Sequence, residues 1–160
     1  MKKVKLGLGM AGAALASCAI IGSVRTRKAD MQTIKKDNDK RLDNYNLLMH
    51  WLEVKNAGGS VASYFNDMGY KKVAVYGMWD LANRLIEDAE SGGIDIVYGI
   101  DRDAACCISQ LENVYSLEDE LPEADVIVVT PFYAFDEIKS VLSTKIKCPV
   151  ISLEDVVWSV

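Results

Sequence analysis

The chain has 160 residues, of which 50% are apolar and 26% are charged, and its formal net charge is −5. This length suits one domain with a proper core plus an appendage, and it excludes two full catalytic domains. Residues 1–41 hold ten Lys and Arg against three Asp, whereas residues 42–160 hold eight against twenty Asp and Glu. Because an acidic body does not attract a phosphate backbone, the sequence predicts no nucleic-acid partner.

An uncharged run covers residues 6–24, with three lysines before it and Arg25, Arg27 and Lys28 soon after it. As a helix it would be roughly 28 Å long at 1.5 Å per residue, close to the hydrocarbon thickness of a bilayer. The excess of basic residues after the run predicts that the body faces the cytoplasm. We therefore expect a single-pass transmembrane anchor in a bacterial cytoplasmic membrane.

Two alternatives to an anchor stay open. The letters LASC at residues 15–18 match the bacterial lipoprotein pattern, in which Cys18 would carry the lipid. The many small residues of the run also allow a cleaved signal peptide. Apolar residues continue past Cys18, and the run is longer than most signal cores, which favours the uncleaved anchor of residues 1–24.

Residues 25–44 are polar and lack a sustained apolar face, which predicts a charged, partly helical stalk. A domain is predicted over residues 45–160. Two helices should open it: the first carries an apolar stripe that begins at Tyr45, and Ser60 is placed to cap the second.

From residue 72 the pattern alternates between apolar strands and helices. Strands are expected over 73–76, 94–100, 114–116, 125–130 and 148–152, and helices over 80–90, 133–144 and 153–158. Continuous apolar strands are what a parallel sheet covered on both faces requires. Right-handed crossovers with one reversal of direction predict a doubly wound α/β sheet of five strands in the order 3-2-1-4-5. Its carboxyl edge, where the loops after the first and fourth strands meet, is the expected place for a ligand.

The letters VAVYGMWDLANRL, residues 73–85, resemble the strand, turn and helix of a dinucleotide-binding unit. Such a unit has G-x-G-x-x-G or G-x-G-x-x-A, whereas this window reads GMWDLA and places Trp79 at the second glycine. Trp79 adds bulk and Asp80 adds negative charge where a diphosphate must approach the backbone. Two unit charges about 4 Å apart repel by roughly 4 kcal/mol at an effective dielectric near 20, so we expect impaired diphosphate binding.

Further candidates lie at the same edge. Asp101 ends the second strand, near the place where an acid of this fold accepts hydrogen bonds from a ribose, although an aspartate there can also cap a turn. Asp80 can similarly be interpreted as a helix cap, and Trp79 as a packed aromatic. The candidate cofactor-binding residues are Gly77, Trp79, Asp80, Ala82, Asp101, Arg102 and Thr130.

Four segments carry a resemblance to a known family: GYKKVAVYGMWDLANRLIED, VYGIDRD, LPEADVIVVTPFYAFDEI and KCPVISLEDV. They resemble small Rossmann-like domains of bacterial surface-polysaccharide clusters, including relatives of the sugar-binding domain of PglD-type acyltransferases and epimerase-like fragments. The resemblance covers roughly residues 45–158. It implies a nucleotide or nucleotide-sugar site at Gly77 and Asp101, and less directly at Ala82.

No catalytic motif accompanies this resemblance. The sequence has neither a Tyr-x-x-x-Lys pair nor a G-x-S-x-G elbow, and its one histidine, His50, precedes the sheet. No C-x-x-C metal spacing occurs either. We therefore expect a membrane-anchored, non-catalytic Rossmann-like module with weak nucleotide or nucleotide-sugar binding. The alternatives are an NAD(P)- or nucleotide-sugar-dependent enzyme component of surface-polysaccharide synthesis, and an interaction domain that docks a protein partner or forms a homodimer.

Overall fold

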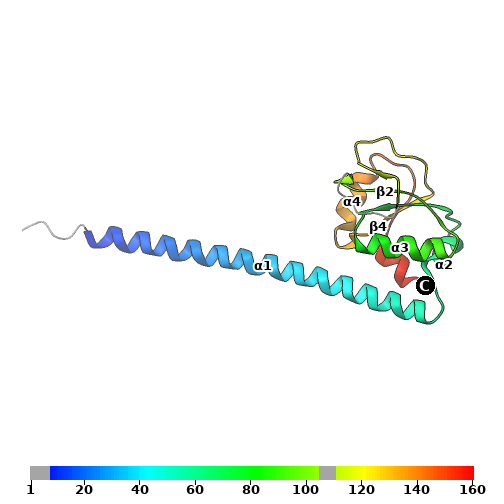
Figure 1. The fold of residues 1–160 in the computed structure, drawn as a ribbon. Helices are drawn as coiled ribbons and strands as arrows, with labels where there is room; N and C mark the ends of the chain where they lie inside the picture. The colour runs from blue at the N-terminus through cyan, green and yellow to red at the C-terminus, as the bar shows by residue number, and fades with distance from the viewer. Residues whose placement is uncertain (1–7, 105–110) are drawn as a thin grey trace, which may run out of the picture. The chain divides into compact units, whose positions relative to one another are not determined.

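The computed structural model describes residues 8–104 and 111–160 (Figure 1). Within the first helix, side chains are described at residue 27 and from residue 30 onward. The chain separates into two compact units, Met1–Asn44 and Tyr45–Val160. The candidate site belongs entirely to the second unit.

The first helix, α1, extends from Leu8 to Asn56. It runs without a break through residues 25–44, so the stalk that we expected to be partly helical is a continuous helix. Among the residues that the structure describes, no helix is both long and apolar enough to cross a membrane. The expected anchor and Cys18 fall where side chains are not described, so the anchor and the lipoprotein alternative stay predictions.

The second unit contains a five-stranded sheet whose strand pairs are all parallel. The strands are β1 (Lys72–Tyr76), β2 (Asp95–Ile100), β3 (Val114–Tyr115), β4 (Val126–Val129) and β5 (Val150–Ser152). Their order, β3-β2-β1-β4-β5, confirms the predicted order 3-2-1-4-5. The direction of winding reverses between β1 and β4, which places the switch point of the sheet beside the loop that contains Gly77.

Helices cover both faces of this sheet. They are α2 (Val61–Asp67), α3 (Asp80–Ser91), α4 (Phe135–Leu142) and α5 (Leu153–Trp158), with a 3₁₀ turn, η2 (Phe132–Ala134), before α4. As predicted, Ser60 caps α2, because its side chain accepts a hydrogen bond from the backbone N–H of Ala62.

Successive residues of β1 point to opposite faces and enter two separate cores. Val73 and Val75 pack with the end of α1 and with α2, α3 and α5. Ala74 and Tyr76 pack on the other face, with α4. Burial on both faces explains why the strands are apolar without alternation. Because the strands pair in parallel, the carboxyl ends of β1, β2, β4 and β5 lie along one edge of the sheet.

Candidate functional site

The turn from β1 into α3 is built on Gly77, which has a φ of +89°. A Cβ added there would lie 2.7 Å from Cδ of Pro131 and 3.0 Å from Oγ1 of Thr130. Conformation and close packing therefore both require glycine at this position. Gly77 forms a tight turn, as the sequence predicts, but a neighbouring loop of the protein fills the space beside it.

Thr130 ties the end of β4 to this turn. Its Oγ1 donates a hydrogen bond to the carbonyl oxygen of Gly77 at 2.6 Å, and its backbone N–H donates to that of Tyr76 at 3.0 Å. The side chain is only 3% exposed. Thr130 therefore serves the turn itself, and its hydroxyl proton is directed at the backbone.

Asp101 holds the same turn from the other side. Its Oδ2 accepts a hydrogen bond from the backbone N–H of Met78 at 2.8 Å, and its Oδ1 accepts one from Asp103 N–H at 3.1 Å. The side chain of Met78 is buried against Gly99, where an added Cβ would lie 2.6 Å from its Sδ. Both carboxylate oxygens of Asp101 thus bond to backbone amides of the protein.

The structure contradicts two interpretations that the sequence allowed: Trp79 as a packed aromatic and Asp80 as a helix cap. Trp79 is 78% exposed, so its interpretation as a packed aromatic is wrong; Met78 occupies the core instead. Trp79 is also the N-cap residue of α3, and it makes no side-chain capping bond. Asp80 is the first residue of the helix and not its cap, and its carboxylate there interacts favourably with the helix dipole.

The other two candidates do not join the turn. Ala82 is fully buried on α3, where a small residue lets the helix pack closely on the sheet. Arg102 is exposed in the bend after Asp101. The structure thus unites Gly77, Asp101 and Thr130, leaves Trp79 and Arg102 exposed at the edge, and buries Ala82 in the core.

A hollow of about 390 Å³ lies farther along the carboxyl edge, beyond β4 and β5. It is lined by η2, the start of α4 and the start of α5, and Tyr133 in its wall is 50% exposed. Four carboxylates surround it: Asp136, Glu137, Glu154 and Asp155. This hollow is therefore unfavourable for a phosphate and suits an uncharged or cationic group.

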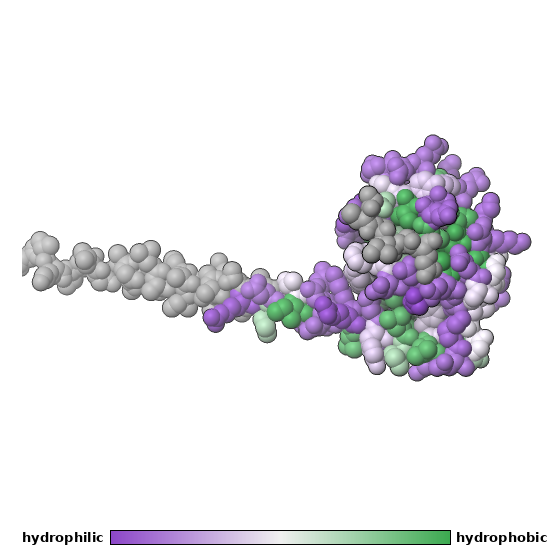
Figure 2. Space-filling view, viewed as in Figure 1, coloured by the Kyte–Doolittle hydropathy of each residue, from purple (hydrophilic) through white to green (hydrophobic). Residues whose placement is uncertain are grey.

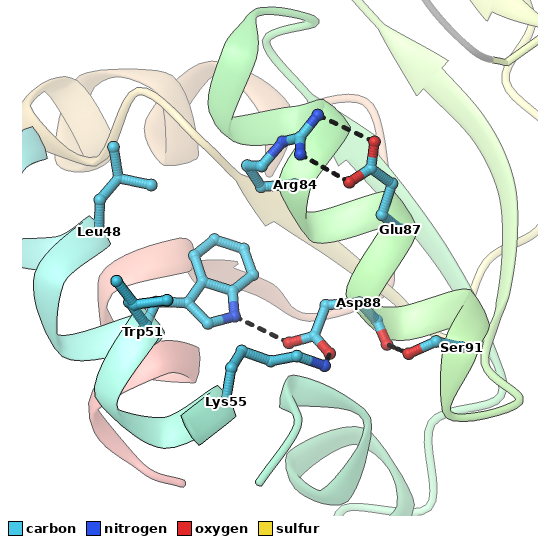
Figure 3. A pocket seen from close by; sticks show the side chains of 8 residues that line it. Leu48, Trp51, Lys55, Arg84, Glu87, Asp88 and Ser91 are labelled. Carbon is cyan, nitrogen blue, oxygen red and sulfur yellow. Dashed lines mark hydrogen bonds and ion pairs between the residues drawn. The ribbon is translucent and has the colours of Figure 1, made fainter. Parts of the chain in front are cut away.

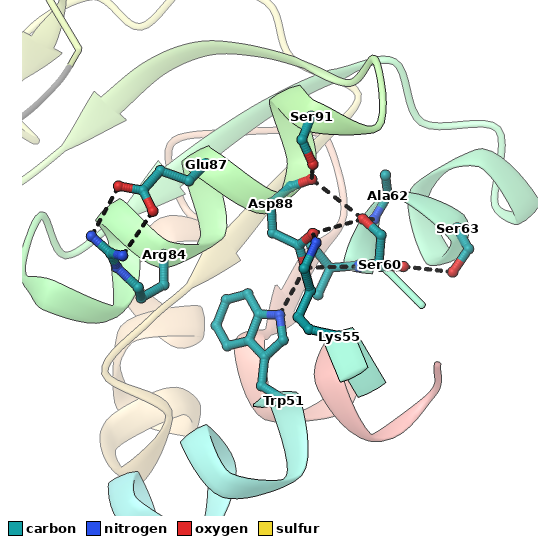
Figure 4. A network of polar contacts seen from close by, with 10 residues as sticks. Trp51, Lys55, Ser60, Ala62, Ser63, Arg84, Glu87, Asp88 and Ser91 are labelled. Carbon is teal, nitrogen blue, oxygen red and sulfur yellow. Dashed lines mark hydrogen bonds and ion pairs between the residues drawn. The ribbon is translucent and has the colours of Figure 1, made fainter. Parts of the chain in front are cut away.

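A second hollow, of about 420 Å³, lies between the end of α1 and α3 (Figure 3). Trp51 and Lys55 on α1 point toward Asp88 on α3, which is only 6% exposed. Trp51 Nε1 donates to Asp88 Oδ2 at 2.8 Å, and Lys55 Nζ donates to Asp88 Oδ1 at 2.6 Å. Ser60 Oγ and the N–H of Val61 add bonds of 2.8 and 3.2 Å (Figure 4).

Burial raises the pKa of Asp88, but these hydrogen bonds together lower it by more, so the pKa lies below its ordinary value. Asp88 thus joins α1, the start of α2 and α3 through one ionised carboxylate. The sequence did not predict a role for Asp88. The available signal was an acid on the apolar side of a predicted helix, between Leu85 and Ala89.

His50 does not belong to the carboxyl-edge site. Its ring stacks on that of Trp158 with centroids 3.9 Å apart, and its Nδ1 lies 3.8 Å from Glu53 Oε2. Across residues 8–104 and 111–160, no three His, Cys, Asp or Glu side chains are grouped to hold a metal ion. The described edge therefore offers aromatic side chains and carboxylates, without a histidine beside them.

No protein-family model, characterised protein or solved structure matched this chain. The resemblance to surface-polysaccharide domains stays a prediction. The five-stranded parallel α/β sheet stands independently of it, because strand order and register define that fold.

Proposed function

We propose that the chain is a membrane-anchored Rossmann-like module that acts by binding and not by catalysis, with at most weak affinity for NAD(P), nucleotides or nucleotide sugars. The observation that carries this proposal is the hydrogen bond from Met78 N–H to Asp101. In a dinucleotide site the turn approaches the pyrophosphate and the acid holds the ribose. Here the acid, Asp101, accepts a hydrogen bond from the turn itself, through the N–H of Met78.

Charge and shape support the same proposal. The carboxylate of Asp80 lies in the first turn of α3, where unpaired N–H groups would otherwise attract an anion. Its repulsion of a phosphate about 4 Å away, roughly 4 kcal/mol at a dielectric near 20, exceeds the 0.3–1 kcal/mol usually gained from a helix dipole. The carboxylates around the neighbouring hollow add to this repulsion.

An interaction domain is the second candidate, and the exposure of Trp79 favours it. Trp79 is 78% exposed and Tyr133 is 50% exposed, and they lie on the loops that follow two adjacent strands, β1 and β4. Tryptophan and tyrosine are enriched among the residues that dominate binding energy at protein interfaces. Aromatic faces also stack on sugar rings or bases, so the ligand we favour is one with a flat or apolar face and no diphosphate.

Calorimetry and thermal shifts on the full-length chain in detergent test the proposal, with NAD, NADP and UDP-glucose as probes. A ligand that binds only the folded state must raise the melting temperature. We expect no saturable binding tighter than about 1 mM for the natural chain, and about tenfold tighter binding after Trp79→Gly with Asp80→Asn, which removes both bulk and charge.

Glu90→Gln is the matched control, because it removes an exposed acid at the other end of α3. It should leave affinity unchanged. Micromolar binding of a dinucleotide to the natural chain, weakened by the double change, would show that Trp79 and Asp80 contact the ligand. That result would overturn the proposal.

Protease treatment of intact cells tests the anchor separately. Retention of residues 6–24 predicts a membrane-bound body that protease reaches only after lysis. Digestion from outside, or lipid on Cys18, would contradict this part of the proposal and leave the binding argument untouched.

A further inference from the structure

The described part of α1 carries a series of exposed apolar side chains. Seven are between 41% and 69% exposed: Met31, Ile34, Leu42, Tyr45, Leu48, Met49 and Leu52. At about 100° per residue, all seven fall within a strip of about 120° on one side of the helix. Figure 2 shows apolar groups interrupting the hydrophilic surface of this stretch of helix.

The buried residues of α1 lie on the opposite side. Leu47, Trp51 and Val54 pack into the core of the second unit and are at most 8% exposed. In a helix these positions are turned well away from Tyr45 and Leu52. The apolar strip is therefore a second face of α1, separate from the face that packs on the domain. Met31, Ile34 and Leu42 extend this strip into residues 25–44, where the sequence predicted no sustained apolar face.

Exposure of the helix around Met31 and Ile34 leaves their apolar surface uncovered. The described side chains from residue 30 to residue 39 are all exposed. Most helical stability in proteins comes from burying an apolar face. A partner that covers the strip would supply that burial.

We propose that α1 pairs with α1 of a second copy of this chain, parallel and in register. Heptad spacing places Met31, Asn38, Tyr45 and Leu52 at a positions, and Ile34, Arg41 and Leu48 at d positions. Each apolar seam residue then meets its own copy. Asn38 also meets itself, and a single asparagine at an a position is a device that fixes register in parallel coiled coils.

Charge complementarity favours this orientation. Asp30 occupies a g position and Lys35 the following e position, and these two face each other across a parallel pair. Asp37 also occupies a g position, so an antiparallel pair would set aspartates on the same flank against each other. Arg41 is unfavourable in the seam; its long stem lets the charge reach solvent, and we expect a dimer of modest affinity.

The seam ends after Leu52, near the end of α1. The next d position is Lys55, which is engaged by Asp88. Leu48 and Leu52 line the hollow beside that pair. The last turn of the partner helix would therefore lie at the mouth of this hollow, and it would cover the apolar side chains exposed there.

Disulfide cross-linking in native membranes tests the proposal with the full-length chain. In a background with all four cysteines replaced by serine, Ile34→Cys and Asn38→Cys should each form a disulfide-linked dimer on mild oxidation, because a and d positions bring identical residues within disulfide reach. Gln32→Cys and Lys36→Cys, on the opposite side of the helix, should each give at least about fivefold less disulfide-linked dimer. Equal cross-linking at all four positions would overturn the seam.

Mass measurement of the full-length chain in detergent adds a matched pair. Ile34→Glu places a charge in the seam and should convert dimer to monomer, whereas Lys36→Glu should leave the dimer intact. Asp30→Lys should weaken the dimer severalfold, and adding Lys35→Asp should restore it. A monomeric natural chain at all concentrations, or a dimer unchanged by Ile34→Glu, would contradict the proposal. Neither outcome bears on the carboxyl edge.

Discussion

Asp101 and Asp88 both accept hydrogen bonds from the protein, but they lie in different settings. Asp101 follows a strand at the carboxyl edge and accepts two backbone N–H groups from its own and the adjoining loop. Asp88 lies on the buried side of α3 and accepts bonds from α1, from the loop before α2 and from α2 itself. The first shapes a turn, whereas the second joins α1 and the start of α2 to α3.

Position along the chain does not fix what a carboxylate does. Asp101 stands where a ribose-binding acid belongs, yet its partners are local amides. Asp88 stands inside an ordinary amphipathic helix, yet it is the more deeply buried of the two. Partners decide the role, and for Asp88 those partners lie 27 to 37 residues away in sequence.

The largest effect should come from Asp88→Ala. Removing a buried carboxylate leaves Trp51 Nε1 and the N–H of Val61 without their acceptor, and we expect a loss of about 3 kcal/mol in the free energy of unfolding. Glu87→Ala, which removes an exposed ion pair with Arg84, should cost at most about 0.5 kcal/mol. Urea unfolding measures both. Equal losses of stability in the two variants would show that Asp88 contributes no more to stability than an exposed ion pair does.

The pH dependence of the free energy of unfolding also tests the contribution of Asp88. The pKa of Asp88 is lowered in the folded state, so its stabilisation is present above the ordinary pKa near 3.8 and is lost as the pH falls through the folded-state value. Asp125, whose pKa is lowered by hydrogen bonds from Lys72 and Lys71, acts in the same direction. Acid titration of Asp88→Asn should therefore show a shallower loss of stability than the natural chain.

Gly77→Ala should have the next largest effect, because it combines backbone strain with a contact of 2.7 Å to Pro131. We expect a loss of about 2–3 kcal/mol. Gly93 has a similar φ of +83° but nothing within 4 Å of an added Cβ, so Gly93→Ala should cost only about 1 kcal/mol. Thermal unfolding of the two variants separates strain from crowding. Equal losses of stability in the two variants would show that Pro131 moves at little cost to make room for the added Cβ.

Trp79→Ala should have the smallest effect on stability. An indole that is 78% exposed contributes little packing, so we expect a change within about 0.5 kcal/mol by urea unfolding. This variant separates binding from folding, because any partner that uses the aromatic edge should lose affinity while the fold stays intact. A loss above about 2 kcal/mol would indicate that Trp79 packs in solution.

Much of the fold was predictable because its signals are local. Apolar strands such as that ending at Val129, alternating with helices, predict a parallel sheet, and handedness then gives its order. The location of Gly77 followed from its motif. Two outcomes depend on tertiary packing: which of Met78 and Trp79 enters the core, and which groups the Asp101 carboxylate contacts. Met78 and Trp79 are adjacent apolar residues, and the sequence alone does not show which of them is buried. The spacing of residues also does not show which backbone groups the Asp101 carboxylate will bond.

The central claim is that the protein's own side chains, Asp101 and Thr130, hold the turn at Gly77. The N–H group of Met78 tests this claim most directly. This N–H belongs to the turn that a pyrophosphate would approach, and here it donates to Asp101. In ¹⁵N-labelled full-length chain titrated with NAD to about 1 mM, the account predicts no saturable change in the amide resonances of Gly77 and Met78. A saturable shift of these two resonances at micromolar NAD, lost in Asp101→Ala, would contradict it.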